Sequence, residues 1–190
     1  MTVPLNDVGT LSRRAQDIVA AAGDLLEREG PDALTMRAIG DALGIQAPSL
    51  YKHFANKAAV ESALIDAGLL EIGDACHAVV RRPPALSVIA RLLRTYRAWG
   101  IAHPNLYRLA TTGRLDRAAL TPGREEWAGT PFYVAAGEEP HLAQALWSFT
   151  HGTLILELDD RYADGSDLDR TWAAGADAFT AAVAAVSRAK

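Results

Sequence analysis

The chain has 190 residues, a length that suits one medium domain or a small domain fused to a larger one. Its net charge of -4 at pH 7 excludes a protein that is basic over its whole surface, but not one with a small local DNA-binding face. The single cysteine, Cys76, excludes an internal disulfide and a cysteine-based zinc site, and no apolar run is long enough to span a membrane.

Apolar residues recur at helical spacing nearly throughout this alanine-rich chain, and no convincing strand alternation is found. Glycine and proline mark helix ends, as at Gly30-Pro31 and Gly44, while Thr35 and Asn56 are predicted N-terminal caps. In chain order, the pattern predicts helices over residues 12–29, 36–43, 47–54, 57–80, 86–102, 104–112, 140–158 and 168–188, with short helix and loops over residues 114–139. We therefore predict an all-α fold.

Residues 35–57, TMRAIGDALGIQAPSLYKHFANK, have the pattern of a helix-turn-helix. Gly44 stands in the turn, where glycine adopts a left-handed conformation without strain. Two crossed helices and the preceding long helix would share a core made by Ile39, Leu43, Ile45, Leu50 and Phe54. The outer side of the second helix would then carry Gln46, Ala47, Pro48, Ser49, Lys52 and His53. The spacing alone is also compatible with an αα-hairpin inside an ordinary helical protein.

The segment over residues 34–60 resembles the DNA-binding signature of the tetracycline-repressor-like (TetR-type) regulators. The markers are Leu34-Thr35, Ile39, Ala42-Leu43-Gly44-Ile45 and the run Leu50-Tyr51-x-His53-Phe54-x-x-Lys57. Gly40 departs from the alanine that is usual in the family, which lowers helix propensity. The resemblance implies an N-terminal three-helix DNA-binding domain in residues 1–57 and a larger helical domain for ligand binding and dimerisation in residues 58–190.

The resemblance also implies which side chains contact double-stranded DNA. Contacts to phosphates or the DNA backbone would come from Thr35, Tyr51, His53 and Lys57. Residues 46–49 would form the base-reading end, and Arg37 would reach a guanine edge, although a solvated surface arginine explains Arg37 nearly as well. The full predicted DNA-binding set is Thr35, Arg37, Gln46, Ala47, Pro48, Ser49, Tyr51, Lys52, His53 and Lys57.

The larger region carries a partial second signature. The W-x-x-x-H-G pattern in residues 147–152, with Tyr96-Arg97-x-Trp99 and His103-Pro104-x-x-Tyr107, resembles the WHG class of TetR-type C-terminal domains. In the family, the last two long helices of each subunit form a four-helix dimer bundle. The helices predicted over residues 140–158 and 168–188 suit that role, so we expect a homodimer, with an intramolecular core as the alternative.

Aromatic and histidine side chains are concentrated in the same region. Trp99 and His103 lie four residues apart, as do Trp147 and His151, so each pair would share a helix face. If these faces oppose each other, they would line a cavity for a small hydrophobic or aromatic effector. The predicted ligand-binding set is Trp99, His103, Tyr107, Trp127, Trp147 and His151. A filled core is the competing interpretation.

The sequence has no recognisable catalytic pattern. The histidines form no H-x-x-x-H or H-E-x-x-H pair, and no Walker, dinucleotide or nucleophile-elbow glycine motif occurs. Residues 1–7 lack a signal-peptide pattern, so we expect a cytoplasmic protein with no membrane partner. We predict a ligand-responsive regulator without enzyme activity, cofactor or metal, most simply a repressor that leaves a palindromic operator when its effector binds. An all-α enzyme, or a helical interaction protein that does not bind DNA, is the alternative.

Overall fold

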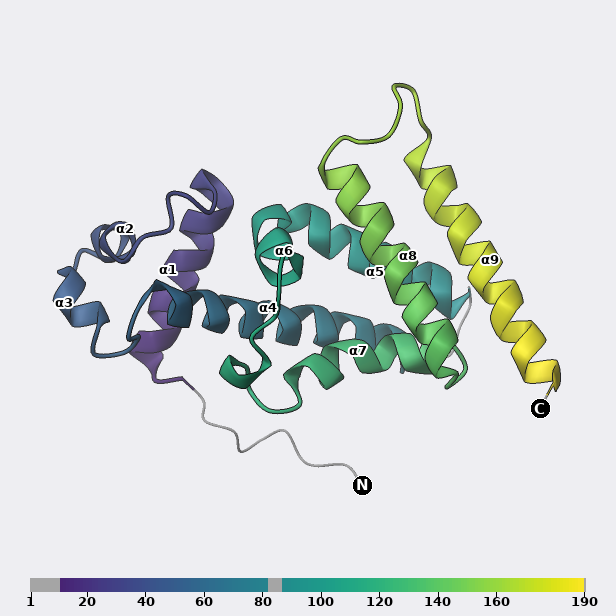
Figure 1. Ribbon diagram of the computed structural model, residues 1–190, viewed down its shortest axis with the longest axis horizontal. Helices are drawn as coiled ribbons and strands as arrows, with labels where there is room; N and C mark the ends of the chain where they lie inside the picture. The colour runs from purple at the N-terminus through teal and green to yellow at the C-terminus, as the bar shows by residue number, and fades with distance from the viewer. Residues whose placement is uncertain (1–10, 82–86, 190) are drawn as a thin grey trace. The chain divides into compact units, whose positions relative to one another are not determined.

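The computed structural model describes residues 11–81 and 87–189, and every regular element in these ranges is helical (Figure 1). The helices are α1 (Arg13–Glu29), α2 (Met36–Ala42), α3 (Ala47–Leu50), α4 (Lys57–Val80), α5 (Val88–Ala102), α6 (Pro104–Thr111), a short 3-10 helix (Arg117–Ala119), α7 (Arg124–Ala135), α8 (Pro140–Leu158) and α9 (Leu168–Ala189). The predicted all-α fold is confirmed, and the predicted helix start at Leu86 lies outside the described residues. No helix in the described ranges is long and apolar enough to cross a membrane.

Local hydrogen bonds set the helix ends near the motif. Thr35 Oγ1 and Asn56 Oδ1 each accept a backbone N–H from three residues further on, at 3.1 and 2.9 Å, so both predicted caps are confirmed. The prediction that the second motif helix extends to Phe54 is wrong, because α3 ends at Leu50. The Leu50 carbonyl accepts from the N–H groups of both His53 and Phe54, and this tight turn ends the helix.

Helix α7 is continuous where the sequence predicted only short helix and loops. Pro131 lies inside it and has no N–H to donate to the Trp127 carbonyl four residues back. The side chain of His77 on α4 replaces that donor, with Nε2 3.0 Å from the Trp127 oxygen. Because a carbonyl only accepts, Nε2 carries the proton in this contact. The imidazole also stacks on the Trp127 indole, with ring centroids 3.7 Å apart.

The chain packs into two compact units, which are described separately below. The first consists of the described residues up to Leu69 together with His103–Glu125, and the second of Leu70–Ala102 and the described residues from Glu126 onward. The predicted functional boundary after residue 57 falls at the start of α4, whereas the two units divide within α4. That boundary therefore stays a prediction.

The first unit has its core on the apolar face of α1. Ile18, Ala22 and Leu26 are fully buried there. They pack with buried residues in and just before the motif, namely Leu34, Met36, Ile39, Leu50 and Phe54. Val60 and Leu64 of α4 are buried in the same core, and Leu106 and Leu109 of α6 are partly buried against it.

The N-terminus of α6 is capped by a side chain from another helix of the first unit. The Glu27 carboxylate accepts the N–H groups of Asn105 at 3.1 Å and Leu106 at 2.8 Å, which belong to the donors that a helix start leaves unpaired. The Asn105 side chain donates in turn to the Leu26 carbonyl at 3.0 Å. His103 occupies the N-cap position but makes no side-chain cap bond, so the cap of α6 is supplied by Glu27 of α1.

In the second unit, α5 and α9 approach α8 through glycines. A Cβ at Gly100 would overlap the Leu154 side chain, and a Cβ at Gly175 would overlap the Phe149 ring. Glu157 on α8 also joins the three helices, because it accepts from the Arg97 guanidinium of α5 at 2.7 Å and from the Trp172 indole N–H of α9 at 2.8 Å.

We expect His77→Phe to lower the free energy of unfolding by about 1–3 kcal/mol, because the half-buried Trp127 carbonyl loses its donor while ring stacking remains possible. Pro131→Ala returns a backbone N–H to that carbonyl, so His77→Phe should cost clearly less in the Pro131→Ala background. Chemical denaturation of the wild type, the two single variants and the double variant measures this coupling. An equal cost of His77→Phe in both backgrounds would contradict the assignment.

Candidate nucleic-acid interface

Helix α2 ends in a Schellman motif that directs the chain into α3. Gly44 has φ +64°, its N–H donates to the Asp41 carbonyl at 3.1 Å, and the Ile45 N–H donates to the Gly40 carbonyl at 2.9 Å. These are the two bonds that define the motif around a left-handed residue. A Cβ at position 44 would meet nothing within 4 Å, so glycine is required there for its backbone conformation and not for space. The predicted turn is confirmed.

The inner side of the motif is buried as the sequence predicted. Ile39, Leu50 and Phe54 are buried in the core of the first unit, and Leu43 and Ile45 are partly buried against it. Because both short helices bury these residues against α1 and α4, their opposite sides face solvent.

The predicted DNA-binding side chains lie mainly on the solvent-facing side. Tyr51 is 53% exposed, although a large aromatic residue would ordinarily be buried. The exposed members are Thr35, Arg37, Gln46, Pro48, Tyr51, Lys52 and His53, while Ser49 and Lys57 are half-buried and Ala47 begins α3. Arg37 and Gln46 line one hollow of about 450 Å³ beside Gly44, so the structure brings these two predicted residues together.

Two predicted DNA contacts have carboxylate neighbours that the sequence analysis overlooked. Lys57 Nζ lies 3.3 Å from Glu61, and Arg37 Nε lies 3.9 Å from Asp41. Both carboxylates stand four residues after their partner on the same helix, and this spacing could have identified them. Such partly or fully exposed pairs contribute at most about 1 kcal/mol, so a phosphate can replace either carboxylate. Within the described ranges, Lys52 has no ion pair.

The predicted ligand-binding residues are divided between the two units. The first unit holds His103 and Tyr107, and the second holds Trp99, Trp127, Trp147 and His151. The predicted common face of Trp99 and His103 is wrong, because α5 ends before His103, which has φ -129° and ψ 57°. The residue before a proline avoids the helical conformation, and here Pro104 follows. The predicted pocket therefore stays a prediction.

Trp127 and Trp147 differ from ordinary core tryptophans in their polar contacts or in their exposure. The Trp127 indole donates to Asp74 at 2.9 Å and is stacked on His77, which places it between α4 and α7. Trp147 is 45% exposed on α8 and stacks on His151, with ring centroids 5.5 Å apart. The predicted pairing of Trp147 with His151 on one helix face is confirmed, and a filled core does not describe Trp147 within this chain.

Burial changes the chemistry of one thiol and one imidazole in the second unit. Burial raises the pKa of the Cys76 thiol to about 12, so the thiol stays protonated and non-nucleophilic at neutral pH. Burial lowers the pKa of His151 from its usual 6.5, so its imidazole is neutral at pH 7 and has both a donor and an acceptor nitrogen. Among residues 11–81 and 87–189, no group of three or more His, Cys, Asp or Glu side chains is placed to hold a metal ion.

Comparison with known families and proteins agrees with this geometry. Residues 18–64 match the family described as "Bacterial regulatory proteins, tetR family", and residues 89–179 match "Tetracyclin repressor-like, C-terminal domain". The HTH-type transcriptional regulator Rv0681 of Mycobacterium tuberculosis is 31% identical over 159 residues, which are 75% of this chain and 69% of that protein. The chain belongs to the TetR family of bacterial transcriptional regulators. The narrower WHG class is not named by these matches and stays a prediction.

Further similarities are either shorter or confined to the fold. The tetracycline repressor protein class A from transposon 1721 of Escherichia coli is 45% identical over 64 residues, which are 34% of this chain but only 29% of that repressor. A protein of unknown function from Rhodococcus sp. RHA1 has a TM-score of 0.73 at 21% identity, over 94% of this chain and 97% of its own. The TetR family protein ActR of Streptomyces coelicolor, solved with (S)-DNPA, has a TM-score of 0.67 at 22% identity, over 90% of this chain and 96% of its own.

Proposed function

We propose that the protein is a repressor that binds a palindromic operator as a homodimer and leaves it when a small hydrophobic or aromatic molecule binds. The observation that carries the proposal is the α2–α3 geometry, in which a Schellman turn and a buried inner face leave the side chains of Gln46, Pro48, Tyr51, Lys52 and His53 exposed. Short helices presented in this way enter the major groove of DNA. This role suits the expected cytoplasmic location.

Positioning on the DNA would come from side chains that contact phosphates. The Thr35 hydroxyl accepts the Ala38 N–H and keeps its own hydrogen for a phosphate oxygen. Lys52 and Lys57 would supply positive charge to the phosphates, and the exposed Tyr51 and His53 side chains would donate hydrogen bonds to the DNA backbone.

Sequence preference would come from the start of α3. Gln46 and Ser49 can form hydrogen bonds with base edges, and the apolar surfaces of Ala47 and Pro48 suit a thymine methyl group. Arg37 would join them at a guanine, since it lines the same hollow as Gln46.

We expect Lys52→Ala and Lys57→Ala each to weaken binding to all DNA sequences alike. Each should also reduce the steepness with which the logarithm of the binding constant falls with the logarithm of the salt concentration, here called the salt slope, by about 1 for each protomer. The cause is the loss of one phosphate contact and the counterion release that accompanies it. Titrations against an operator selected from a random pool and against unrelated DNA, at several salt concentrations, measure this. Arg161→Ala, in the loop after α8, is the control and should leave the slope unchanged. A loss confined to the selected operator would contradict the assignment.

Dimerisation through α8 and α9 is part of the same proposal. Leu156 of α8 is a large apolar side chain, yet it is 43% exposed to water. On α9, Ala178 is exposed, whereas Phe179 packs against Phe149 of the same chain with ring centroids 5.6 Å apart. A second copy would cover Leu156 and Ala178 and leave the Phe149 contact intact.

Ala178→Glu should produce monomers at concentrations where the wild type is dimeric, because the proposed seam would bury an unpaired charge. Sedimentation velocity measures the change, and circular dichroism checks that the helices remain. Ala163→Glu, in the exposed loop before α9, is the matched control and should stay dimeric. An intact Ala178→Glu dimer would place the interface elsewhere.

Effector binding by the aromatic and histidine set is the third part of the proposal. Support comes from the stacked pair of exposed Trp147 and half-buried His151, whose indole face and neutral imidazole suit a flat ligand with one hydrogen-bonding group. The likeness to ActR, which was solved with a small molecule, supports ligand binding by this fold.

Trp147→Ala should cost less than the about 3–5 kcal/mol typical of a fully buried tryptophan, while operator binding survives and effector release is lost. Neutral aromatic compounds are first screened for release of the operator, and a releasing compound is then tested with the variant and in thermal melts. Tyr133→Ala, which removes a similarly exposed aromatic side chain from α7, should still respond. A large loss of stability with normal release would identify Trp147 as a packing residue.

A further inference from the structure

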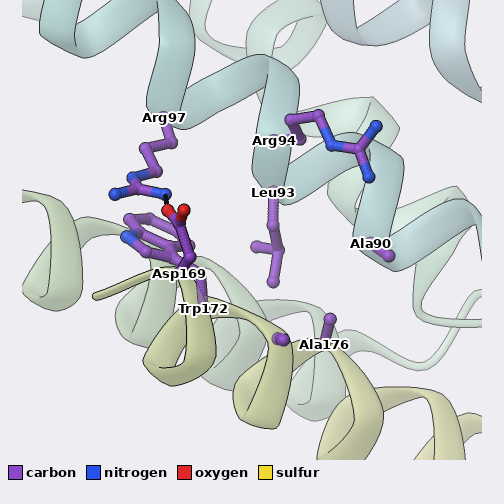
Figure 2. A pocket seen from close by; sticks show the side chains of 8 residues that line it. Ala90, Leu93, Arg94, Arg97, Asp169, Trp172 and Ala176 are labelled. Atoms are coloured by element: carbon purple, nitrogen blue, oxygen red, sulfur yellow. Dashed lines mark hydrogen bonds and ion pairs between the residues drawn. The ribbon is translucent and has the colours of Figure 1, made fainter. Parts of the chain in front are cut away.

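A groove of about 430 Å³ lies between α5 and α9 in the second unit, outside the predicted effector set (Figure 2). Its floor is apolar and is formed by Leu93 of α5 with Trp172, Ala173 and Ala176 of α9. Figure 2 shows Leu93 pointing from α5 toward α9 between two arginines of the same helix. A volume of this size suits a small organic molecule.

One of these arginines already has its charge compensated. The Arg97 guanidinium donates to both oxygens of Glu157, at 2.7 to 3.1 Å, and to Asp169 at 2.6 Å. It also lies over the Trp172 ring, 5.6 Å from the ring centroid. Two carboxylates against one guanidinium make this end of the groove unfavourable for a further anion.

The other arginine has no such partner. Arg94 is exposed and lines the groove, and within the described residues no carboxylate pairs with it. A guanidinium offers a planar fork of N–H donors that matches a carboxylate, and such a charge-assisted pair is stronger than a neutral hydrogen bond. The groove therefore combines one unpaired cationic donor with an apolar floor.

We propose that this groove binds an amphipathic organic carboxylate, whose carboxylate pairs with Arg94 and whose apolar body covers Leu93, Ala173 and Ala176. The two anions around Arg97 orient the ligand, because they repel its carboxylate from the Trp172 end. A neutral molecule gains only the apolar contact, and a cation is repelled by Arg94. This groove shares no residue with the predicted DNA-binding set or with the predicted effector set.

The test titrates 4-phenylbutyrate into the full chain labelled with ¹⁵N at tryptophan, and follows the four indole N–H signals by NMR. The Trp172 signal, assigned with Trp172→Phe, should shift and saturate, since its indole lies in the groove and donates to Glu157. Arg94→Gln should weaken binding by about tenfold, the effect of one lost charge-assisted pair. Ala173→Leu should weaken it as well by filling the groove.

Two matched variants and one matched compound serve as controls. Arg170→Gln is matched to Arg94→Gln, since it removes the same charge from an exposed arginine of α9. Ala174→Leu is matched to Ala173→Leu, since it adds the same volume at the neighbouring exposed position. Neither residue lines the groove, so both variants should bind 4-phenylbutyrate normally. The neutral amide 4-phenylbutyramide should bind the wild type about as weakly as the acid binds Arg94→Gln. The proposal would be overturned if Arg94→Gln bound normally or if the acid and the amide bound equally well. It would also be overturned if the Trp99 and Trp147 signals saturated without a Trp172 shift, and that result would instead support ligand binding by the effector set.

Discussion

The buried apolar face of α1 is the constraint on which the DNA-facing part of the molecule depends. Helix α2 has seven residues and α3 has four, far fewer than the about 12–15 that an isolated helix needs to persist in water. Both are retained because Ile39 and Leu50 lose all contact with solvent in the core of the first unit. Burial of those side chains decides which residues of the motif are left outside, and hence which can reach DNA.

In the second unit, contacts between distant segments complete polar groups that local structure leaves unsatisfied. The His77 ring supplies the Trp127 carbonyl, 50 residues away, with the donor that Pro131 lacks. Glu157 accepts from Arg97, 60 residues away, and from the Trp172 indole. Unmade hydrogen bonds of buried groups cost more than made ones contribute, so these contacts determine which helices can pack together.

The surfaces that this packing leaves open differ in chemistry. Helix α8 exposes Trp147 and Leu156 on opposite flanks, so its aromatic flank suits a flat ligand and its aliphatic flank another apolar surface. The groove between α5 and α9 adds the unpaired charge of Arg94 to an apolar floor. Because Glu157 and Asp169 neutralise Arg97 within the same unit, the two arginines of one helix have different capacities for an external anion.

The sequence by itself determined the helical fold, most helix ends and the motif, because these depend on local rules. Apolar spacing, caps such as Thr35 and the left-handed turn at Gly44 act within one or two turns of helix, so they can be read along the chain. The boundaries of α4 and α8 were predicted to the residue. The exposure of Lys52 and His53 also followed from the spacing of their buried neighbours, whereas the outward position of Tyr51 was implied only by the family resemblance.

Only the tertiary structure decided the contacts that join distant residues. The continuity of α7 required His77, and the N-terminus of α6 required Glu27 of α1, and neither requirement leaves a local pattern. By contrast, the end of α5 between Trp99 and His103 follows from the local effect of Pro104 on the residue before it. A side chain's partner across the fold depends on how helices pack, and helical periodicity specifies which face is buried but not what buries it.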